Sequence, residues 1–261
     1  MGELWDKYIQ PVLDSWHRWD NYSWVWEPFL ENYPKFDDLQ RTNVEIALVE
    51  SAFDPNQKLA IKALSIVETL YRQKLSSGKL IERMTDRLRN QIILINLNDE
   101  ISPYYIFAFS TFGMIEAVPF IKSVLSDLEQ IIDNIDNEGK EDNHESMLWA
   151  CCISLSTLNP EEAKPSLALL LGYDKRMGFL PQPGQEFTYS GLTCRALLNQ
   201  WGNVGINGLE AILLSARDWT EEQRNQIFLL VTNTVQRNYK ISPEEKQDAQ
   251  KLAKELLRIS Q

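Results

Sequence analysis

The chain has 261 residues, of which 44% are hydrophobic, and it carries a formal net charge of −11 at pH 7. This apolar content is that of a folded protein and excludes a disordered chain. The negative charge disfavours nucleic acids and anionic membranes as partners, because both present negative charge, and it favours a basic protein partner.

Residue types that carry special chemistry are scarce. The three cysteines, Cys151, Cys152 and Cys194, lie in apolar helical contexts, so we expect buried thiols in a reducing compartment. The first eight residues lack the apolar core of a signal peptide, and no apolar stretch is long enough to span a bilayer, which together predict a cytoplasmic protein without membrane contact. No zinc-ligand spacing and no catalytic motif is present, so the sequence predicts no cofactor and disfavours an enzyme.

Residues 1–36 form the first distinct region, because they hold five of the eight tryptophans. One interpretation is a helical cap whose aromatic side chains cover the end of the helices that follow. The other is an aromatic binding surface, since tryptophan is enriched at interface hot spots. The sequence favours the cap and leaves the binding surface open.

Helix signals dominate the rest of the chain, and strand signals are nearly absent. Four predicted helix starts combine a capping residue with a following proline: Asp54-Pro55, Ser102-Pro103, Asn159-Pro160 and Ser242-Pro243. Apolar residues recur at the three- and four-residue spacing of helices. The predicted helices span 3–19, 22–32, 38–52, 55–75, 78–96, 103–112, 115–133, 145–158, 161–171, 188–201, 204–217, 220–237 and 243–259.

An internal repeat is the most informative feature of the sequence. Residues 112–125 align without a gap with residues 158–171, and a weaker copy covers 201–214. In each copy the last apolar residue of one helix is followed by a turn, and a new helix then starts with proline, or Gly208 in the third copy, in its first turns. The offsets of 46 and 43 residues fall within the window of about 40–47 residues for helical repeats.

These copies resemble the HEAT-like (armadillo-type) helical repeat superfamily, especially its Leu-Gly-x-x-x-Ala-Val-Pro-x-Leu type. The resemblance implies an all-α fold, an α-α superhelix or solenoid of stacked antiparallel helix pairs over residues 37–261, with residues 1–36 as a Trp-rich cap. It does not imply one activity, because HEAT-like proteins include scaffolds, bilin lyases, DNA glycosylases and bacterial immunity proteins.

An acidic segment between two predicted helices has the spacing of a calcium-binding EF-hand loop. Oxygen-bearing side chains fall at Asn134, Asp136, Glu138 and Glu145, with Gly139 at the sharp turn. The first position is Asn where that motif has Asp, and Glu141 stands where an apolar residue is usual. The sequence therefore favours a solvated acidic linker over a metal site.

A second segment, Gly172 to Thr188, is too long for a turn between repeats and contains several glycines and prolines. Insertions in repeat arrays often lie on the binding face. Under that interpretation Lys175 and Arg176 contact a partner, with the aromatic residues Phe179, Phe187 and Tyr189 nearby. Under the alternative, Phe179 pins the loop to the helices.

The sequence thus predicts a non-enzymatic protein that binds another, basic protein, in the manner of an acidic immunity or inhibitor protein. The alternative is a HEAT-like lyase or chaperone that acts on a cofactor-bearing partner, with Phe179, Phe187 and Tyr189 lining its pocket.

Overall fold

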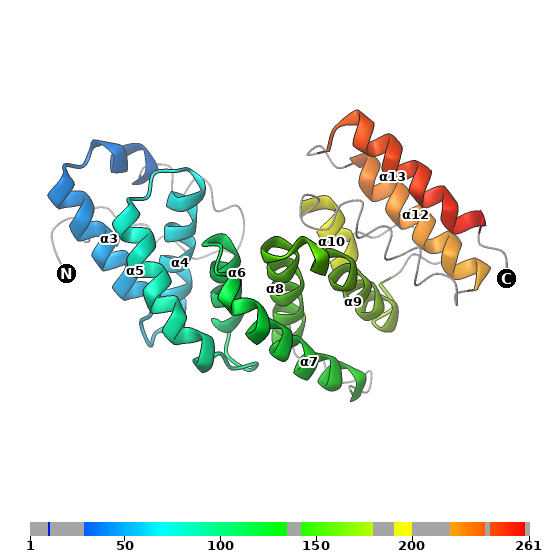
Figure 1. The fold of residues 1–261 in the computed structure, drawn as a ribbon, viewed down its shortest axis with the longest axis horizontal. Helices are drawn as coiled ribbons and strands as arrows, with labels where there is room; N and C mark the ends of the chain where they lie inside the picture. The colour runs from blue at the N-terminus through cyan, green and yellow to red at the C-terminus, as the bar shows by residue number, and fades with distance from the viewer. Residues whose placement is uncertain are drawn as a thin grey trace. The chain divides into compact units, whose positions relative to one another are not determined.

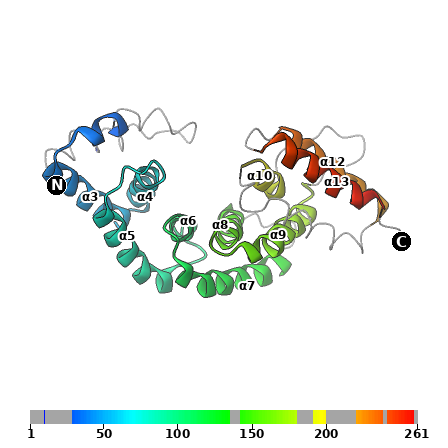
Figure 2. The ribbon, with the colours of Figure 1, turned by 45° about the horizontal axis from the view of Figure 1, so that its top comes forward.

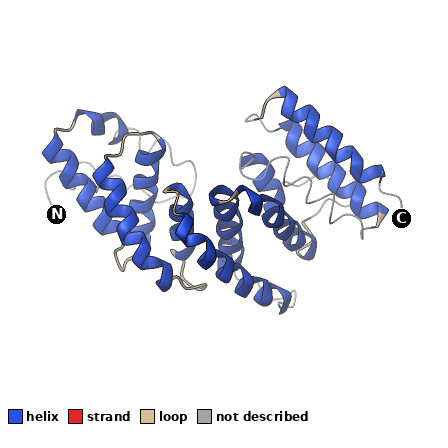
Figure 3. Ribbon diagram, in the orientation of Figure 1, coloured by secondary structure: helices blue, strands red, loops and turns tan. Residues whose placement is uncertain are grey.

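A computed structural model describes Gln10 and residues 29–134, 142–179, 191–199, 220–237 and 241–258 of the chain. All regular secondary structure in these residues is helical, and none of them lies in a strand (Figure 3). This confirms the all-α fold. None of the described helices is both long and apolar enough to cross a membrane.

The chain divides into two compact units, Met1–Phe112 and Gly113–Gln261. The main helices of the first unit are α3 (Asp38–Ala52), α4 (Gln57–Arg72), α5 (Gly78–Gln91) and α6 (Ser102–Thr111) (Figure 1). Those of the second are α7 (Val118–Asn134), α8 (Asp142–Leu158), α9 (Ala163–Arg176), α10 (Leu192–Asn199), α12 (Glu221–Arg237) and α13 (Pro243–Glu255). Helices that follow one another pack together in several pairs, notably α3 with α4, α8 with α9, and α12 with α13 (Figure 2).

The capping residues define the helix starts, although two of the predicted caps are wrong. Helix α4 begins at Gln57 and is capped by Asn56, because the Asp54 carboxylate instead accepts the backbone N–H of Asn56 at 2.8 Å. Helix α6 starts one residue early, at Ser102, whose hydroxyl accepts the backbone N–H of Asn96 at 3.1 Å rather than capping α6. Both side chains therefore stabilise the loop before the helix.

The cap predicted at the last helix is confirmed. The Ser242 hydroxyl accepts the backbone N–H of Glu245 at 3.2 Å, and the Glu245 carboxylate accepts the backbone N–H of Ser242 at 2.8 Å. These two reciprocal bonds form a capping box that satisfies two orphan donors.

The two best repeat copies have the same local structure. Each passes from the end of a helix through a 3₁₀ turn, η4 (Ile115–Ala117) or η5 (Pro160–Glu162), into a helix with proline in its first turn. Residues 46 positions apart are buried in both copies. The buried pairs are Ala117 and Ala163, Ile121 and Leu167, Leu125 and Leu171, and Leu128 and Asp174. The third copy, at 201–214, lies outside the described residues.

Candidate functional site

The predicted partner-binding loop begins later in the chain than expected. Residues 172–176 continue α9 as helix, so the prediction of an insertion that begins at Gly172 is wrong. Helix α9 is terminated by Gly178, two residues after its last residue, where φ is +70°. There the backbone N–H of Phe179 bonds to the Asp174 carbonyl at 2.9 Å. Gly172 lies inside the helix, where glycine costs only about 1 kcal/mol and does not by itself end it.

The five residues predicted for partner binding therefore lie in different places. Lys175 and Arg176 are exposed in the last turn of α9, where cations complement the helix dipole. Phe179 follows the helix and is half-buried. Phe187 and Tyr189 lie outside the described residues. The structure thus shows Lys175 and Arg176 on one accessible turn.

Of the four predicted calcium ligands, Asp136 and Glu138 lie outside the described residues. Asn134 is the last residue of α7. Glu145 lies in the first turn of α8, and its carboxylate pairs with the Arg195 guanidinium at 3.4 Å. Within the part of the chain that the structure describes, no three side chains of the types that bind metals gather into a site.

The predicted burial of the three cysteines is confirmed. Cys151, Cys152 and Cys194 are free and buried. Burial raises the pKa of the Cys151 thiol and that of the Cys152 thiol. Since the thiolate is the reactive species, these two residues belong to the core and not to a nucleophilic site.

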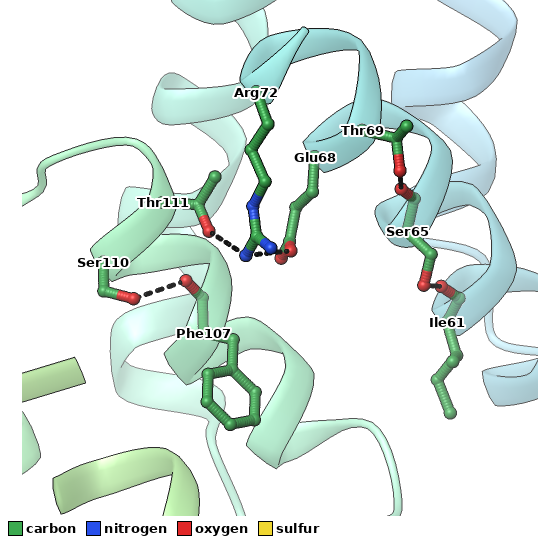
Figure 4. A network of polar contacts seen from close by, with 8 residues as sticks. All are labelled: Ile61, Ser65, Glu68, Thr69, Arg72, Phe107, Ser110 and Thr111. Carbon is green, nitrogen blue, oxygen red and sulfur yellow. Dashed lines mark hydrogen bonds and ion pairs between the residues drawn. The ribbon is translucent and has the colours of Figure 1, made fainter. Parts of the chain in front are cut away.

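Half-buried polar side chains lie along α4, which packs beside α6, and Figure 4 shows their bonds. On α4, the hydroxyl of Ser65 donates to the Ile61 carbonyl at 2.9 Å, and that of Thr69 donates to the Ser65 carbonyl at 2.7 Å. These local bonds satisfy the hydroxyl groups within the helix and leave them no free donor.

Glu68 and Arg72 lie on the same helix. Arg72 contacts the Glu68 carboxylate at 3.3 Å and the Thr111 hydroxyl of α6 at 3.4 Å, so that it bridges the two helices (Figure 4). Burial raises the pKa of Glu68 to about 7, and Arg72 opposes this shift only in part. The Arg72 side chain is 67% exposed and that of Glu68 is 17% exposed, which explains why the cation compensates so little. Glu68 therefore takes up or releases a proton near neutral pH.

Two buried acids link helices that are distant in sequence. Glu45 of α3 accepts the Tyr33 hydroxyl at 2.6 Å, and it also accepts the backbone N–H of Ser77 at 3.0 Å and the Ser77 hydroxyl at 2.5 Å. Asp174 of α9 accepts the backbone N–H groups of Leu192 and Thr193 at 2.8 and 2.7 Å, at the start of α10. Burial raises the pKa of Asp174, and the Thr193 and Leu192 donors offset part of the rise. Both carboxylates have structural roles.

A basic region stands out against the acidic whole. Residues 57–91, which cover α4 and α5, contain eight basic and three acidic residues. The Arg87 guanidinium lies 5.1 Å from the centre of the Phe53 ring, and that ring stacks on Tyr105 with centroids 5.6 Å apart. One buried guanidinium nitrogen of Arg83, Nη1, has no hydrogen-bond partner among the described residues. The α5 surface is therefore locally positive.

Sequence reasoning missed Glu45, Glu68 and Asp174. The partners of Glu45 and Asp174 come from distant parts of the chain, so no local spacing marks these two acids. Glu68 has an ordinary i+4 partner in Arg72, and only its burial in the fold sets it apart. Comparison of the chain with protein-family models, curated proteins and solved structures found no match. What the described residues define is an all-α protein whose buried charges hold its helices together.

Proposed function

We propose that this chain is a non-enzymatic helical-repeat protein of the HEAT-like kind, which binds another protein of basic character. The observation that carries the proposal is the equivalence of the two repeat copies. Both pass through a 3₁₀ turn into a proline-containing first turn, and their aligned positions are buried. A unit that recurs with the same buried positions is what a stacked helical array requires.

The surface charge supports the choice of partner. Stacked helix pairs present long exposed faces for macromolecules. With a net charge of −11, those faces attract a basic protein over distances of several ångströms and raise its association rate. An inhibitor or immunity protein that neutralises a basic toxin fits these properties.

The buried acids are consistent with a binding role. Glu45 and Asp174 are occupied by hydroxyl or backbone N–H donors. The Glu68 carboxylate is engaged by Arg72, and the nearby hydroxyl groups of Ser65 and Thr69 bond to carbonyl groups of α4. General acid–base chemistry needs a donor or acceptor directed at a substrate.

Affinity capture followed by kinetics tests the proposal. The captured partner should be basic, and its association rate should fall steeply between about 50 and 500 mM salt, because exposed charges are screened within roughly 10 Å at 0.1 M. A partner whose association rate does not change with salt would refute an acidic docking face.

We also propose that Lys175 and Arg176 supply polar contacts to that partner, since both are exposed on the last turn of α9. The double variant Lys175→Ala/Arg176→Ala should weaken partner binding and leave the melting temperature unchanged. Phe179→Ala is the structural comparison, because loss of its half-buried ring should lower the melting temperature and leave affinity unchanged. A double variant that binds as tightly as the wild type would exclude these two contacts.

A further inference from the structure

The exposed face of α3 carries an apolar and acidic stripe. Leu39, Asn43, Ile46 and Glu50 occupy the spacing i, i+4, i+7 and i+11, which places them on one side of the helix. All four are exposed, Leu39 to 71% and Ile46 to 38%. We call these four residues the α3 stripe. Single exposed apolar side chains are ordinary on a protein surface, so the α3 stripe gains meaning only from a surface that complements it.

Helix α5, which packs beside α3, carries a second stripe that contains two arginines. Arg83, Arg87, Asn90 and Leu94 have the same i, i+4, i+7, i+11 spacing along α5 and the 3₁₀ turn η3 (Ile92–Leu94) that follows it. Leu94 is 63% exposed, and its neighbour Ile93 is 84% exposed. We call these four residues the α5 stripe.

The two arginines of the α5 stripe have no carboxylate partner among the residues that the structure describes. Neither Arg83 nor Arg87 forms an ion pair with any described residue, whereas Arg89 on the same helix pairs with Asp86 at 2.7 Å. Arg87 lies over the Phe53 ring at 5.1 Å, which restricts its side chain. Arg83 is half-buried, and its buried Nη1 atom has no hydrogen-bond partner among the described residues. A carboxylate from another molecule would pair with the accessible part of this guanidinium.

The two stripes match each other when one is reversed. Along α3 the order is apolar, amide, apolar, acid, and along α5 it is base, base, amide, apolar. At the rise of 1.5 Å per residue, each stripe is about 16 Å long. Antiparallel alignment places opposite charges together at one end and two leucines together at the other. The facing pairs are then Glu50 and Arg83, Ile46 and Arg87, Asn43 and Asn90, and Leu39 and Leu94.

We propose that the α3 stripe of one copy of this chain docks antiparallel on the α5 stripe of a second copy. The two helices are neighbours in the first unit (Figure 1, Figure 2), and the stripes lie on separate helices, so one copy presents both at once. The contact joins different surfaces of the two copies and is therefore head-to-tail, a geometry that builds rings or open chains. It is separate from the docking of a basic partner protein.

Two charge-reversal variants test the pairing. Arg83→Glu/Arg87→Glu reverses the α5 stripe, and Asp38→Arg/Glu50→Arg reverses Glu50 together with the acid next to Leu39. In sedimentation velocity of the full chain from about 1 to 100 µM, the wild type should associate as its concentration rises. Each variant alone should associate at least about tenfold more weakly, because like charges then face each other. An equimolar mixture of the two variants should recover association, since opposite charges meet again.

Matched controls separate this docking from general charge effects. Lys58→Glu/Lys254→Glu changes the net charge as Arg83→Glu/Arg87→Glu does, at two exposed lysines away from the stripes, and it should associate as the wild type does. Leu94→Ser should weaken association, whereas Leu257→Ser, at a leucine that is 47% exposed on the second unit, should not. Circular dichroism confirms that each variant is folded.

Recovery of association in the mixture cannot arise from two misfolded variants, so it would establish the pairing. A wild type that stays monomeric at 100 µM would overturn the proposal. So would variants that associate as the wild type does, or a mixture of folded variants that fails to recover.

Discussion

Replacing Gly191 with alanine should break the link between α9 and α10. A Cβ atom at this position would lie 2.6 Å from Oδ2 of Asp174 and 2.9 Å from its Cγ, closer than real Cβ contacts allow. The carboxylate cannot stay in place, and it is the acceptor for the backbone N–H groups of Leu192 and Thr193. The substitution therefore removes two hydrogen bonds although it replaces none of the residues that form them.

The expected loss follows from the burial of Asp174, whose exposed fraction is 0%. A hydrogen bond to a charged group contributes about 1.5–3 kcal/mol, and two such bonds are lost. A displaced carboxylate that stays buried without donors adds to the penalty, whereas relaxation of the loop reduces it. We expect Gly191→Ala to lower the free energy of unfolding of the second unit by about 3–5 kcal/mol.

Urea unfolding followed by circular dichroism measures this loss, and hydrogen exchange at the amides of Leu192 and Thr193 localises it. Gly172→Ala is the matched control, because Gly172 lies in α9 with no atom within 4 Å of the added Cβ. That control should be neutral or stabilising by up to about 1 kcal/mol, since alanine favours helix over glycine. A Gly191→Ala variant within 1 kcal/mol of the wild type, with the two amides still protected, would refute the role assigned to Asp174.

Three further predictions concern the other acids. Glu68 has a folded pKa raised to about 7, so the folded state binds its proton more tightly than the unfolded state, and the stability this contributes at low pH is lost as the pH rises through 7. The free energy of unfolding of Glu68→Gln, relative to that of the wild type and measured with urea, should therefore rise by roughly 1–3 kcal/mol from pH 5 to pH 8. A difference between the two proteins that does not change with pH would contradict the assignment. Glu45→Ala leaves the donors of Tyr33 and Ser77 without their acceptor, so it should lower the free energy of unfolding by about 2–4 kcal/mol, measured by thermal unfolding. The control is Glu50→Ala, at an exposed acid of the same helix, which should change the free energy of unfolding by less than about 0.5 kcal/mol. Calorimetry with calcium should show no tight binding, and micromolar affinity that is lost in Glu145→Ala would revive the calcium site.

The positions of several helices could be predicted from the sequence because their signals are local. Helix α3 was expected over 38–52 and spans Asp38–Ala52, and its capping box joins Asp37 to Gln40 within a single turn. Helix α12 was expected over 220–237 and spans Glu221–Arg237. Both depend on residues fewer than five positions apart, which a sequence displays directly.

The polar links between helices could not be predicted, because their partners are far apart in the chain. Glu45 reaches Ser77 across 32 positions, and Asp174 reaches Leu192 across 18. Glu45 lies in a predicted helix and Asp174 in the predicted insertion, and in both places an acid resembles an ordinary surface residue until the fold is known. The end of α9 was misplaced because glycine alone does not show whether a helix ends. Gly172 was expected to end the helix, whereas α9 continues to Arg176 and the chain turns away at Gly178, where φ is +70°.

Asp174 and Leu128 lie 46 positions apart, and both are fully buried, on α9 and α7. Extending the alignment of residues 112–125 with 158–171 by three positions pairs these two residues. Leu128 fills its position with apolar volume. At Asp174 the start of α10 instead presents two backbone N–H groups that have no partner within their own helix, and only an acceptor can occupy that position at low cost. An anion there is favoured by the positive end of the α10 dipole as well as by the two hydrogen bonds. The absence of a side chain at Gly191 is the matching requirement, since any Cβ would displace the carboxylate. Asp174 and Gly191 are therefore both needed for the same contact between α9 and α10. Replacing Asp174 with leucine, the residue at position 128, would restore the apolar pattern but leave the first turn of α10 without its acceptor.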